Sequence, residues 1–236
     1  MFTTYLVDPI YNAFIFLLNY MPGGDVGLAI ITLTLIVRII FYPVFASSIR
    51  TSMAMQAVKP QLDEINQRYK DDTEERSKRT MELFKLHRVR PFSTIIATVL
   101  QLVILIALYW ALFYTGLPAI ETARLYPGIA APAAFSTNFF GIFDLFTPHH
   151  IVLAVLVGVS QYFVMHFSLS RMNNLSKNAS ETQKVAQKMQ NYMMLYFLPA
   201  MVAVITYAFP GAVGLYFVTG NIVSLGQEWL IRRKPL

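Results

Sequence analysis

Hydrophobic residues are grouped along this chain into long runs, and polar residues are concentrated between the runs. Five runs have about the 20 residues that an α-helix needs to cross the hydrocarbon core of a membrane. These runs are residues 25–48, 91–115, 149–170, 191–209 and 210–231. The pattern therefore predicts an all-α polytopic membrane protein with five transmembrane helices.

The first segment, residues 1–24, is apolar but too short to cross a membrane. Polar residues, among them Asn12 and Asn19, interrupt its hydrophobic stretch. We expect a short helix that lies in the membrane interface, with Tyr5 and Tyr20 at the level of the lipid headgroups. A frayed apolar tail is the alternative, since chain termini are often poorly ordered.

Residues 49–90 lose the hydrophobic pattern and hold ten Lys or Arg against seven Asp or Glu, so we expect them outside the membrane. Their apolar residues recur at steps of three and four, which predicts a helix with one packing face. The residues of this face are Met55, Val58, Leu62, Ile65 and Tyr69.

A second helix in the same segment is predicted by its start signal. Asp72 with Glu75 three residues later resembles a capping box, and the helix is expected to end near Leu86. The residues expected on its apolar side are Met81, Leu83 and Phe84. The two helices predict a hairpin. Its basic residues could bind anionic lipid or nucleic acid, but we expect a solvated face of mixed charge and no specific nucleic-acid partner.

Basic residues are distributed unevenly between the polar segments. The hairpin, residues 171–190 and residues 232–236 together hold 17 of the 19 Lys and Arg residues, whereas residues 1–24 and 116–148 hold one. Cytoplasmic segments of membrane proteins carry an excess of Lys and Arg. We therefore predict that the hairpin, the loop at 171–190 and the tail at 232–236 are cytoplasmic, and that the loop at 116–148 and the N-terminus lie outside.

Composition supports a membrane protein and excludes some chemistry. Hydrophobic residues make up 56% of the 236 residues, charged residues make up 14%, and the mean hydropathy is +0.49. These values are too apolar for a single soluble core. The chain has no cysteine, which excludes disulfide bonds, thiolate chemistry and thiol ligands for a metal.

Arg38 is the most unusual residue of the first run, because it lies roughly 18 Å into a helix that crosses a 30 Å hydrocarbon core. A cation at this depth is costly, and it usually faces the interior of a helix bundle or a water-filled cavity. Thr34 and Tyr42 lie four residues to either side and share its helical face. Pro43 is expected to bend the helix just beyond the charge.

A buried ion pair is the ordinary structural explanation for such an arginine. The acids closest to the spans are Asp25 and Glu228. Asp25 lies about 20 Å along the same helix from Arg38. Glu228 is the conceivable partner, and an Arg38–Glu228 pair stays open as an alternative.

Neutral polar residues occur at a depth similar to that of Arg38. Gln101, Gln161 and Asn221 come from the second, third and fifth runs, and each could simply join two helices by a hydrogen bond. Together with an unpaired arginine they predict a hydrophilic groove inside the membrane. The predicted groove residues are Arg38, Thr34, Gln101, Gln161, Asn221, Ser224 and Glu228.

Several strings in this sequence resemble one family. They are GLAIITLTLIVRIIFYP at residues 27–43, GVSQYF at 158–163, MQNYMMLYFLPAM at 189–201 and FPGAVGLYFVTGNIVSLGQ at 209–227. With the charged hairpin and Leu100-Gln101 between them, their order and spacing resemble the YidC/Oxa/Alb membrane protein insertases over nearly the whole chain. The resemblance is to a short form of that family, without a large outer domain.

The resemblance implies a function without chemical turnover. In this family the arginine that matches Arg38 lies in a groove that is open to the cytoplasm and to lipid and closed on the outer side. A short polar region of a client enters the groove, and its hydrophobic segment then moves into lipid along the third and fifth spans. The implied partners are newly made membrane proteins and lipid, with the ribosome and the Sec translocon left open, and the implied location is the bacterial plasma membrane.

Two positions depart from the family pattern: Arg90 stands where a small residue or Asn is frequent, and Val103 stands where a proline is frequent. A small channel or transporter that uses the same polar groove is the alternative function. The sequence carries no inverted repeat, no chain of acids and histidines at mid-membrane and no arginine series. It also carries no phosphate-binding loop, nucleophile elbow or HExxH motif, so we expect no enzyme activity, no cofactor and no metal.

Overall fold

The computed structural model describes residues 3–113, 119–169 and 181–233, and it consists almost entirely of helices. The elements in chain order are η1 (Thr3–Val7), α1 (Asp8–Tyr20), η2 (Pro22–Gly24), α2 (Val26–Ile40), α3 (Tyr42–Arg68), α4 (Thr73–Leu86), α5 (Pro91–Phe113), η3 (Thr122–Arg124), β1 (Asn138–Phe139), β2 (Phe143–Asp144), α6 (Ile151–Leu169), α7 (Glu181–Tyr192), η4 (Met193–Phe197), α8 (Leu198–Ala208) and α9 (Gly211–Arg233).

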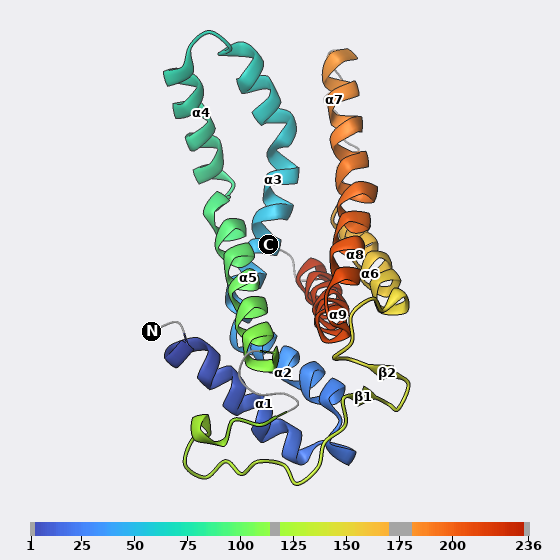
Figure 1. The fold of residues 1–236 in the computed structure, drawn as a ribbon. Helices are drawn as coiled ribbons and strands as arrows, with labels where there is room; N and C mark the ends of the chain where they lie inside the picture. The colour runs from blue at the N-terminus through green and yellow to red at the C-terminus, as the bar shows by residue number, and fades with distance from the viewer. Residues whose placement is uncertain (1–2, 114–118, 170–180, 234–236) are drawn as a thin grey trace.

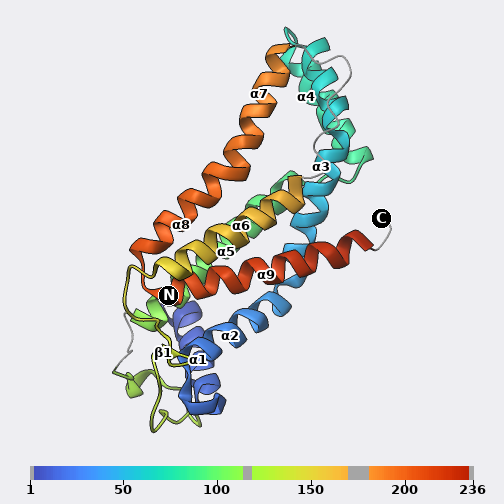
Figure 2. The ribbon, with the colours of Figure 1, turned by 90° about the vertical axis from the view of Figure 1, so that its right-hand side faces the viewer.

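The helices form a central bundle with different structures at its two ends. At one end α3 and α4 project side by side as a hairpin, and α7 projects in the same general direction (Figure 1). At the other end lie α1, which is below α2 in this view, and the segment that contains β1 and β2. In the centre α6 packs against α8 and α9, α2 packs against α9, and α3 packs against α5. Figure 2 shows α7 and α8 following one another as a long, sloping helix.

Several of the helices are long and apolar enough to cross a membrane. Within the described residues, Pro91–Phe113, Ile151–Leu169 and Lys188–Ala208 qualify singly, and α2 with α3 qualifies as a bent pair. The prediction of an all-α polytopic membrane protein is confirmed. Polar and charged residues such as Asn221, Glu228 and Arg232 lower the hydropathy of α9, so the count of five spans stays a prediction.

The first predicted span is broken near Arg38, as its proline predicts. The axes of α2 and α3 differ by 70° at Phe41, the residue between them. Pro43 occupies the first turn of α3, where it has no N–H to donate and its ring would clash with the carbonyl oxygen four residues earlier in a straight helix. Beyond the bend, α3 continues to Arg68 and crosses the predicted boundary between residues 48 and 49.

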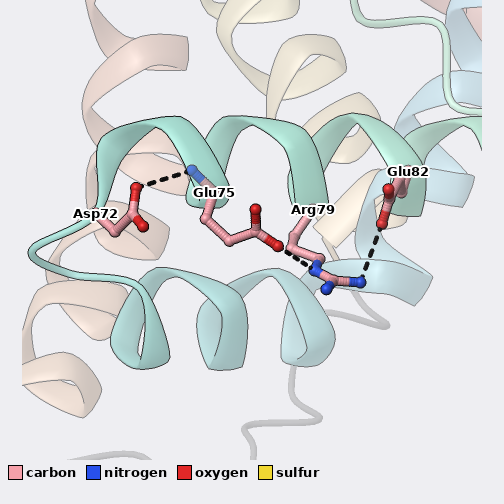
Figure 3. A network of polar contacts seen from close by, with 4 residues as sticks. All are labelled: Asp72, Glu75, Arg79 and Glu82. Atoms are coloured by element: carbon pink, nitrogen blue, oxygen red, sulfur yellow. Dashed lines mark hydrogen bonds and ion pairs between the residues drawn. The ribbon is translucent and has the colours of Figure 1, made fainter.

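The hairpin forms as its local signals predict. The Asp72 carboxylate accepts a hydrogen bond of 2.9 Å from the backbone N–H of Glu75, which caps α4. Glu75 does not complete a capping box, because its carboxylate lies 2.9 Å from Nε of Arg79, and Nη1 of Arg79 is 3.3 Å from Glu82 (Figure 3). The predicted second helix is confirmed at Thr73–Leu86.

A small apolar cluster holds the two arms of the hairpin together. Its buried members are Val58, Leu83 and Val89, and Ala54, Met55, Leu62, Ile65 and Phe84 pack against them. Met81, which was expected on this side, is 54% exposed. The reason is geometric, since two residues turn a helix by about 200° and place Met81 opposite Leu83.

A tight turn connects α4 to α5. Arg88 has a φ of 52°, and the N–H groups of Arg88 and Val89 donate to the carbonyl oxygens of Lys85 and Phe84 at 3.2 and 2.8 Å. This is the Schellman pattern, in which the residue after the helix adopts the left-handed conformation. The turn directs the chain into α5, which begins at Pro91.

The N-terminal segment is a packed helix and not a frayed tail. Tyr11, Phe14 and Ile15 of α1 are fully buried in the main hydrophobic core, whereas Tyr5 and Tyr20 are 78% and 71% exposed. This distribution fits the predicted interfacial helix, whose depth in a membrane stays a prediction.

Parts of several predicted segments lie outside the described residues. These parts are residues 1–2 of the N-terminal segment, residues 114–118 where the second span meets the outer loop, residues 170–180 where the third span meets the loop at 171–190, and residues 234–236 of the tail. Residues 181–190, which were expected to belong to the loop, form most of α7. Their sequence is polar but contains good helix formers such as Glu, Gln, Lys and Ala, so polarity alone does not end a helix there.

Candidate functional site

Arg38 is buried beside the bend between α2 and α3. The residue is 8% exposed. Its guanidinium carbon lies 4.3 Å from the ring centroid of Phe45, which is in the first turn of α3. Gly220 of α9 lies against it, since a β-carbon at Gly220 would be 3.1 Å from Nη2. Within the part of the chain that the structure describes, no carboxylate lies within 4.0 Å of this guanidinium.

A cavity of about 220 Å³ adjoins Arg38. Segments of α2, α3, α6 and α9 surround it, and its polar lining residues besides Arg38 are Ser48, Ser52, Ser168, Ser224, Gln227 and Glu228. At about 30 Å³ for each water molecule, the volume is enough for roughly seven waters. A hydroxyl-rich cavity of this size can keep the guanidinium hydrated below the level of the surface.

Gln227 supplies a second polar group without a partner in this cavity. The residue is 8% exposed, and its Oε1 accepts no hydrogen bond from the described residues. Because this oxygen has almost no accessible surface, it is an unsatisfied acceptor within the cavity wall and not a group exposed to a client.

Glu228, the conceivable partner of Arg38, is engaged elsewhere. Its Oε1 lies 2.5 Å from Nη2 of Arg232, one turn further along α9. The same nitrogen of Arg232 lies 2.5 Å from the carbonyl oxygen of Phe167 on α6, and the guanidinium stacks on the Phe167 ring at 4.3 Å. Glu228 thus forms its ion pair with Arg232 and not with Arg38.

The structure brings three of the seven predicted groove residues to the cavity wall, namely Arg38, Ser224 and Glu228. Gln101 donates to the Tyr216 hydroxyl at 2.6 Å, and Asn221 donates to the Ser160 hydroxyl at 2.9 Å. These bonds join α5 to α9 and α6 to α9.

The other two predicted residues, Thr34 and Gln161, do not line the cavity. The Thr34 hydroxyl is buried and donates to the Ile30 carbonyl oxygen of its own helix at 2.7 Å. Gln161 is half-buried on α6.

Sequence reasoning missed several residues of the cavity. Ser48 and Ser52 are four residues apart on α3, and Gln227 shares a face of α9 with the predicted residues Ser224 and Glu228. Helical spacing was therefore a usable signal for these residues. Phe45 is seven residues from Arg38 but lies across a 70° bend, and no regular helical spacing predicts its place over the guanidinium.

The opposite end of the bundle is covered by the segment between α5 and α6. Oδ1 of Asp25 accepts from the N–H groups of Gly27 and Leu28 at 2.7 and 3.1 Å and caps α2, while its Oδ2 accepts from the N–H of Phe140 at 2.9 Å. Ser136 bonds through its backbone to Gly24 and Val26 at 2.9 and 3.0 Å.

α1 holds the same segment through polar side chains. Asn12 donates to the carbonyl oxygen of Arg124 at 3.0 Å and accepts from the N–H of Tyr126 at 2.7 Å. The Tyr11 hydroxyl accepts from the N–H of Glu121 at 3.0 Å, and burial raises the pKa of this hydroxyl. Asn12, which interrupts the hydrophobic run in the sequence, is therefore a structural tie to the segment that covers this end.

Among residues 3–113, 119–169 and 181–233, no three His, Asp or Glu side chains lie together as a metal site would require.

These features define a class: a helical membrane protein with a buried arginine beside a polar cavity and a loop segment over the opposite end of its helix bundle. The sequence model of the family described as 60Kd inner membrane protein matches residues 17–235, and the chain belongs to this family. The family resemblance predicted from the sequence is thereby confirmed.

Individual relatives agree with the family assignment. Proteins from Francisella tularensis subsp. novicida and Francisella tularensis subsp. holarctica, each named membrane protein insertase YidC, are 31% identical to this chain over 210 residues. The alignments cover 89% of this chain and 33% of each relative. The matching part of the chain thus spans about a third of the length of these relatives.

Proposed function

We propose that this chain is a membrane protein insertase that accepts a polar segment of a newly made membrane protein in the cavity beside Arg38 and releases the adjoining apolar segment into lipid. The observation that carries the proposal is a buried guanidinium that faces a hydroxyl-lined cavity, while the acid in the cavity wall, Glu228, is paired with Arg232. The insertase names of the relatives support it.

The proposed mechanism lowers a barrier and forms no covalent bond. A wet cavity in the membrane shortens the hydrocarbon path that a polar segment must cross, and Arg38 attracts its acidic groups at short range. Partition of the apolar segment supplies the drive, at about 0.3–0.6 kcal/mol for each favourable residue. On this account the chain is not an enzyme and needs no cofactor.

The predicted topology completes the proposal. The chain would lie in the bacterial plasma membrane with its N-terminus outside, and the hairpin, the loop at 171–190 and the tail would be cytoplasmic, as the distribution of Lys and Arg favours. Clients would then enter at the end that bears the hairpin, and the bonds of Asp25 and Ser136 would close the outer end. Newly made membrane proteins and lipid are the partners of this activity.

The test is insertion of a single-span client into liposomes that contain the purified chain, measured as protection of the inserted segment from protease. The client is made with an acidic tail and with a matched neutral tail of Asn and Gln. We expect Arg38→Ala to reduce insertion of the acidic client about tenfold, equivalent to about 1.4 kcal/mol, and to affect the neutral client less. Because no ribosome or Sec translocon is present, the assay also reveals whether either is required.

Arg50→Ala is the matched control, because Arg50 is an exposed arginine of α3 that does not line the cavity. It is expected to insert both clients as the unchanged chain does. Equal insertion of the acidic client by the Arg38→Ala variant and the unchanged chain would refute the assigned role of Arg38.

Water access to the groove from each side of the membrane distinguishes an insertase from a channel. Since the chain has no cysteine, single cysteines at positions 34, 38, 101 and 161 can be labelled selectively in sealed vesicles. An insertase groove predicts water access from the cytoplasmic side only. Labelling from both sides, or ion conductance across a planar bilayer, would favour a channel.

A further inference from the structure

The cavity wall contains two opposite charges that do not pair with each other, Arg38 from α2 and Glu228 from α9. Glu228 is instead held by Arg232, whose Nη2 lies 2.5 Å from Oε1 of Glu228. Arg232 is itself fixed, since the same nitrogen donates to the Phe167 carbonyl oxygen and its guanidinium stacks on the Phe167 ring. The carboxylate is thus bound by a cation that α6 holds in place.

This arrangement affects the charge that Arg38 can offer. The side chains of Arg232 and Glu228 are only 13% and 9% exposed, so water screens their interaction weakly. A carboxylate released from Arg232 would remain in the same small cavity as Arg38 and would be attracted to it. An acidic client segment would then have to displace that carboxylate before it could reach the guanidinium.

We propose that Arg232 is a positioning residue that sets the charge preference of the cavity: it holds the Glu228 carboxylate away from Arg38 and so leaves Arg38 available to acidic client segments. The proposal rests on the proposed insertase function, because it concerns which clients the cavity accepts. Arg232 acts through Glu228 and does not itself contact the client.

The experiment measures the ratio of acidic-client to neutral-client insertion in the same liposome assay. Arg232→Gln keeps an amide donor near Phe167 but removes the charge that holds Glu228. We expect the ratio to fall about fivefold, which corresponds to roughly 1 kcal/mol. Adding Glu228→Gln to Arg232→Gln removes the competing carboxylate, and the double variant is expected to recover the ratio. A structural role of Arg232 alone would not produce this recovery.

Arg233→Gln is the matched control, because Arg233 is the adjacent cation, is exposed and stacks on Trp229 at 3.5 Å. It removes the same charge from the same helix end, and we expect an unchanged ratio.

Other outcomes would overturn the inference. An unchanged ratio for Arg232→Gln, or a double variant no better than Arg232→Gln alone, would show that Arg232 does not act through Glu228. If Arg38→Ala lowers insertion of the acidic client but Arg232→Gln does not, this inference fails and the insertase proposal stands. If the unchanged chain inserts neither client, both fail.

Discussion

Gly220 shapes the site because its missing side chain leaves room for Arg38. A β-carbon at this position would stand 3.1 Å from Nη2 of Arg38, closer than ordinary van der Waals contact. Phe45 covers the guanidinium on another side, at 4.3 Å. The arginine is therefore confined by packing, and its position depends on two residues that carry no charge.

Gly220→Ala is predicted to displace the guanidinium and to reduce insertion of an acidic client a few-fold. In an open helical position this change would stabilise the protein by about 0.5–1 kcal/mol. Here we expect little or no gain, because the shift weakens a cation–π contact that contributes about 0.5–2 kcal/mol. Thermal unfolding in detergent and the insertion assay measure the two effects.

Gly226→Ala provides the comparison, since no described residue lies within 4 Å of a β-carbon at that position of the same helix. It is expected to give the full gain in stability and normal insertion. Equal behaviour of the two alanine variants would show that Gly220 does not confine Arg38.

Single residues of the site were predictable where depth or charge made them stand out. Arg38 was found because a cation in an apolar run is costly, and Ser224 and Glu228 were found because they share a helical face. Phe45 could not be found, since its contact with Arg38 depends on the angle of a bend. Arg232 looked like part of a cytoplasmic tail, and its bond to Glu228 depends on how α6 meets α9.

At the scale of one element, the end of α4 contains a residue in an unfavourable conformation. Arg88 adopts a φ of 52° in the Schellman turn, a conformation that costs a residue with a β-carbon roughly 1 kcal/mol more than glycine. Arg88→Gly is therefore predicted to stabilise the hairpin by about 0.5–1 kcal/mol. Hydrogen exchange of the α4 amides, or thermal unfolding, measures the change.

Arg90→Gly separates the conformational effect from the loss of charge. It removes an equally basic residue two positions later, where φ is not positive. We expect no stabilisation from it. Should both variants change stability equally, the charge and not the backbone conformation would account for the effect.

Elements were predictable where local chemistry defines them and less so where it does not. The cap at Asp72, the apolar face around Val58 and the bend before Pro43 each follow from a few neighbouring residues, and all are present. The predicted boundary at residues 48 and 49 marks a change in composition, but α3 continues through it. The residues on both sides of this boundary can form a helix, so the change in composition does not end α3 there.

At the scale of the whole molecule, Asp25 links the first span to a segment more than a hundred residues away. One carboxylate caps α2 and accepts the Phe140 N–H, so its removal leaves buried donors unsatisfied. Asp25→Ala is predicted to destabilise the protein by about 2–3 kcal/mol. It should also speed hydrogen exchange in residues 136–140, as measured in detergent micelles.

Asp144→Ala is the matched control for this prediction. Within the described residues, the Asp144 carboxylate accepts a local bond from the N–H of Phe146 at 3.1 Å and makes none to α2. We expect a smaller loss of stability and unchanged exchange at residues 136–140. A comparable loss in both variants would contradict the linking role of Asp25.

The long-range ties of the molecule were not predictable from the sequence. Asn12 and Asp25 were visible as polar residues near apolar runs, but their partners lie 110 residues or more along the chain, in a segment without a strong pattern. Hydrophobic periodicity shows which residues share a face, and it does not show which distant loop will cover them.

The continuity of α3 couples two distant parts of the molecule mechanically. The helix begins at Tyr42, places the Phe45 ring on Arg38 within its first turn, and runs on to the tip of the hairpin at Arg68. A sideways push on the base of the hairpin, pivoting about Phe41, therefore also moves the aromatic lid on the guanidinium. A client that displaces the hairpin would therefore also change how far the Phe45 ring covers Arg38.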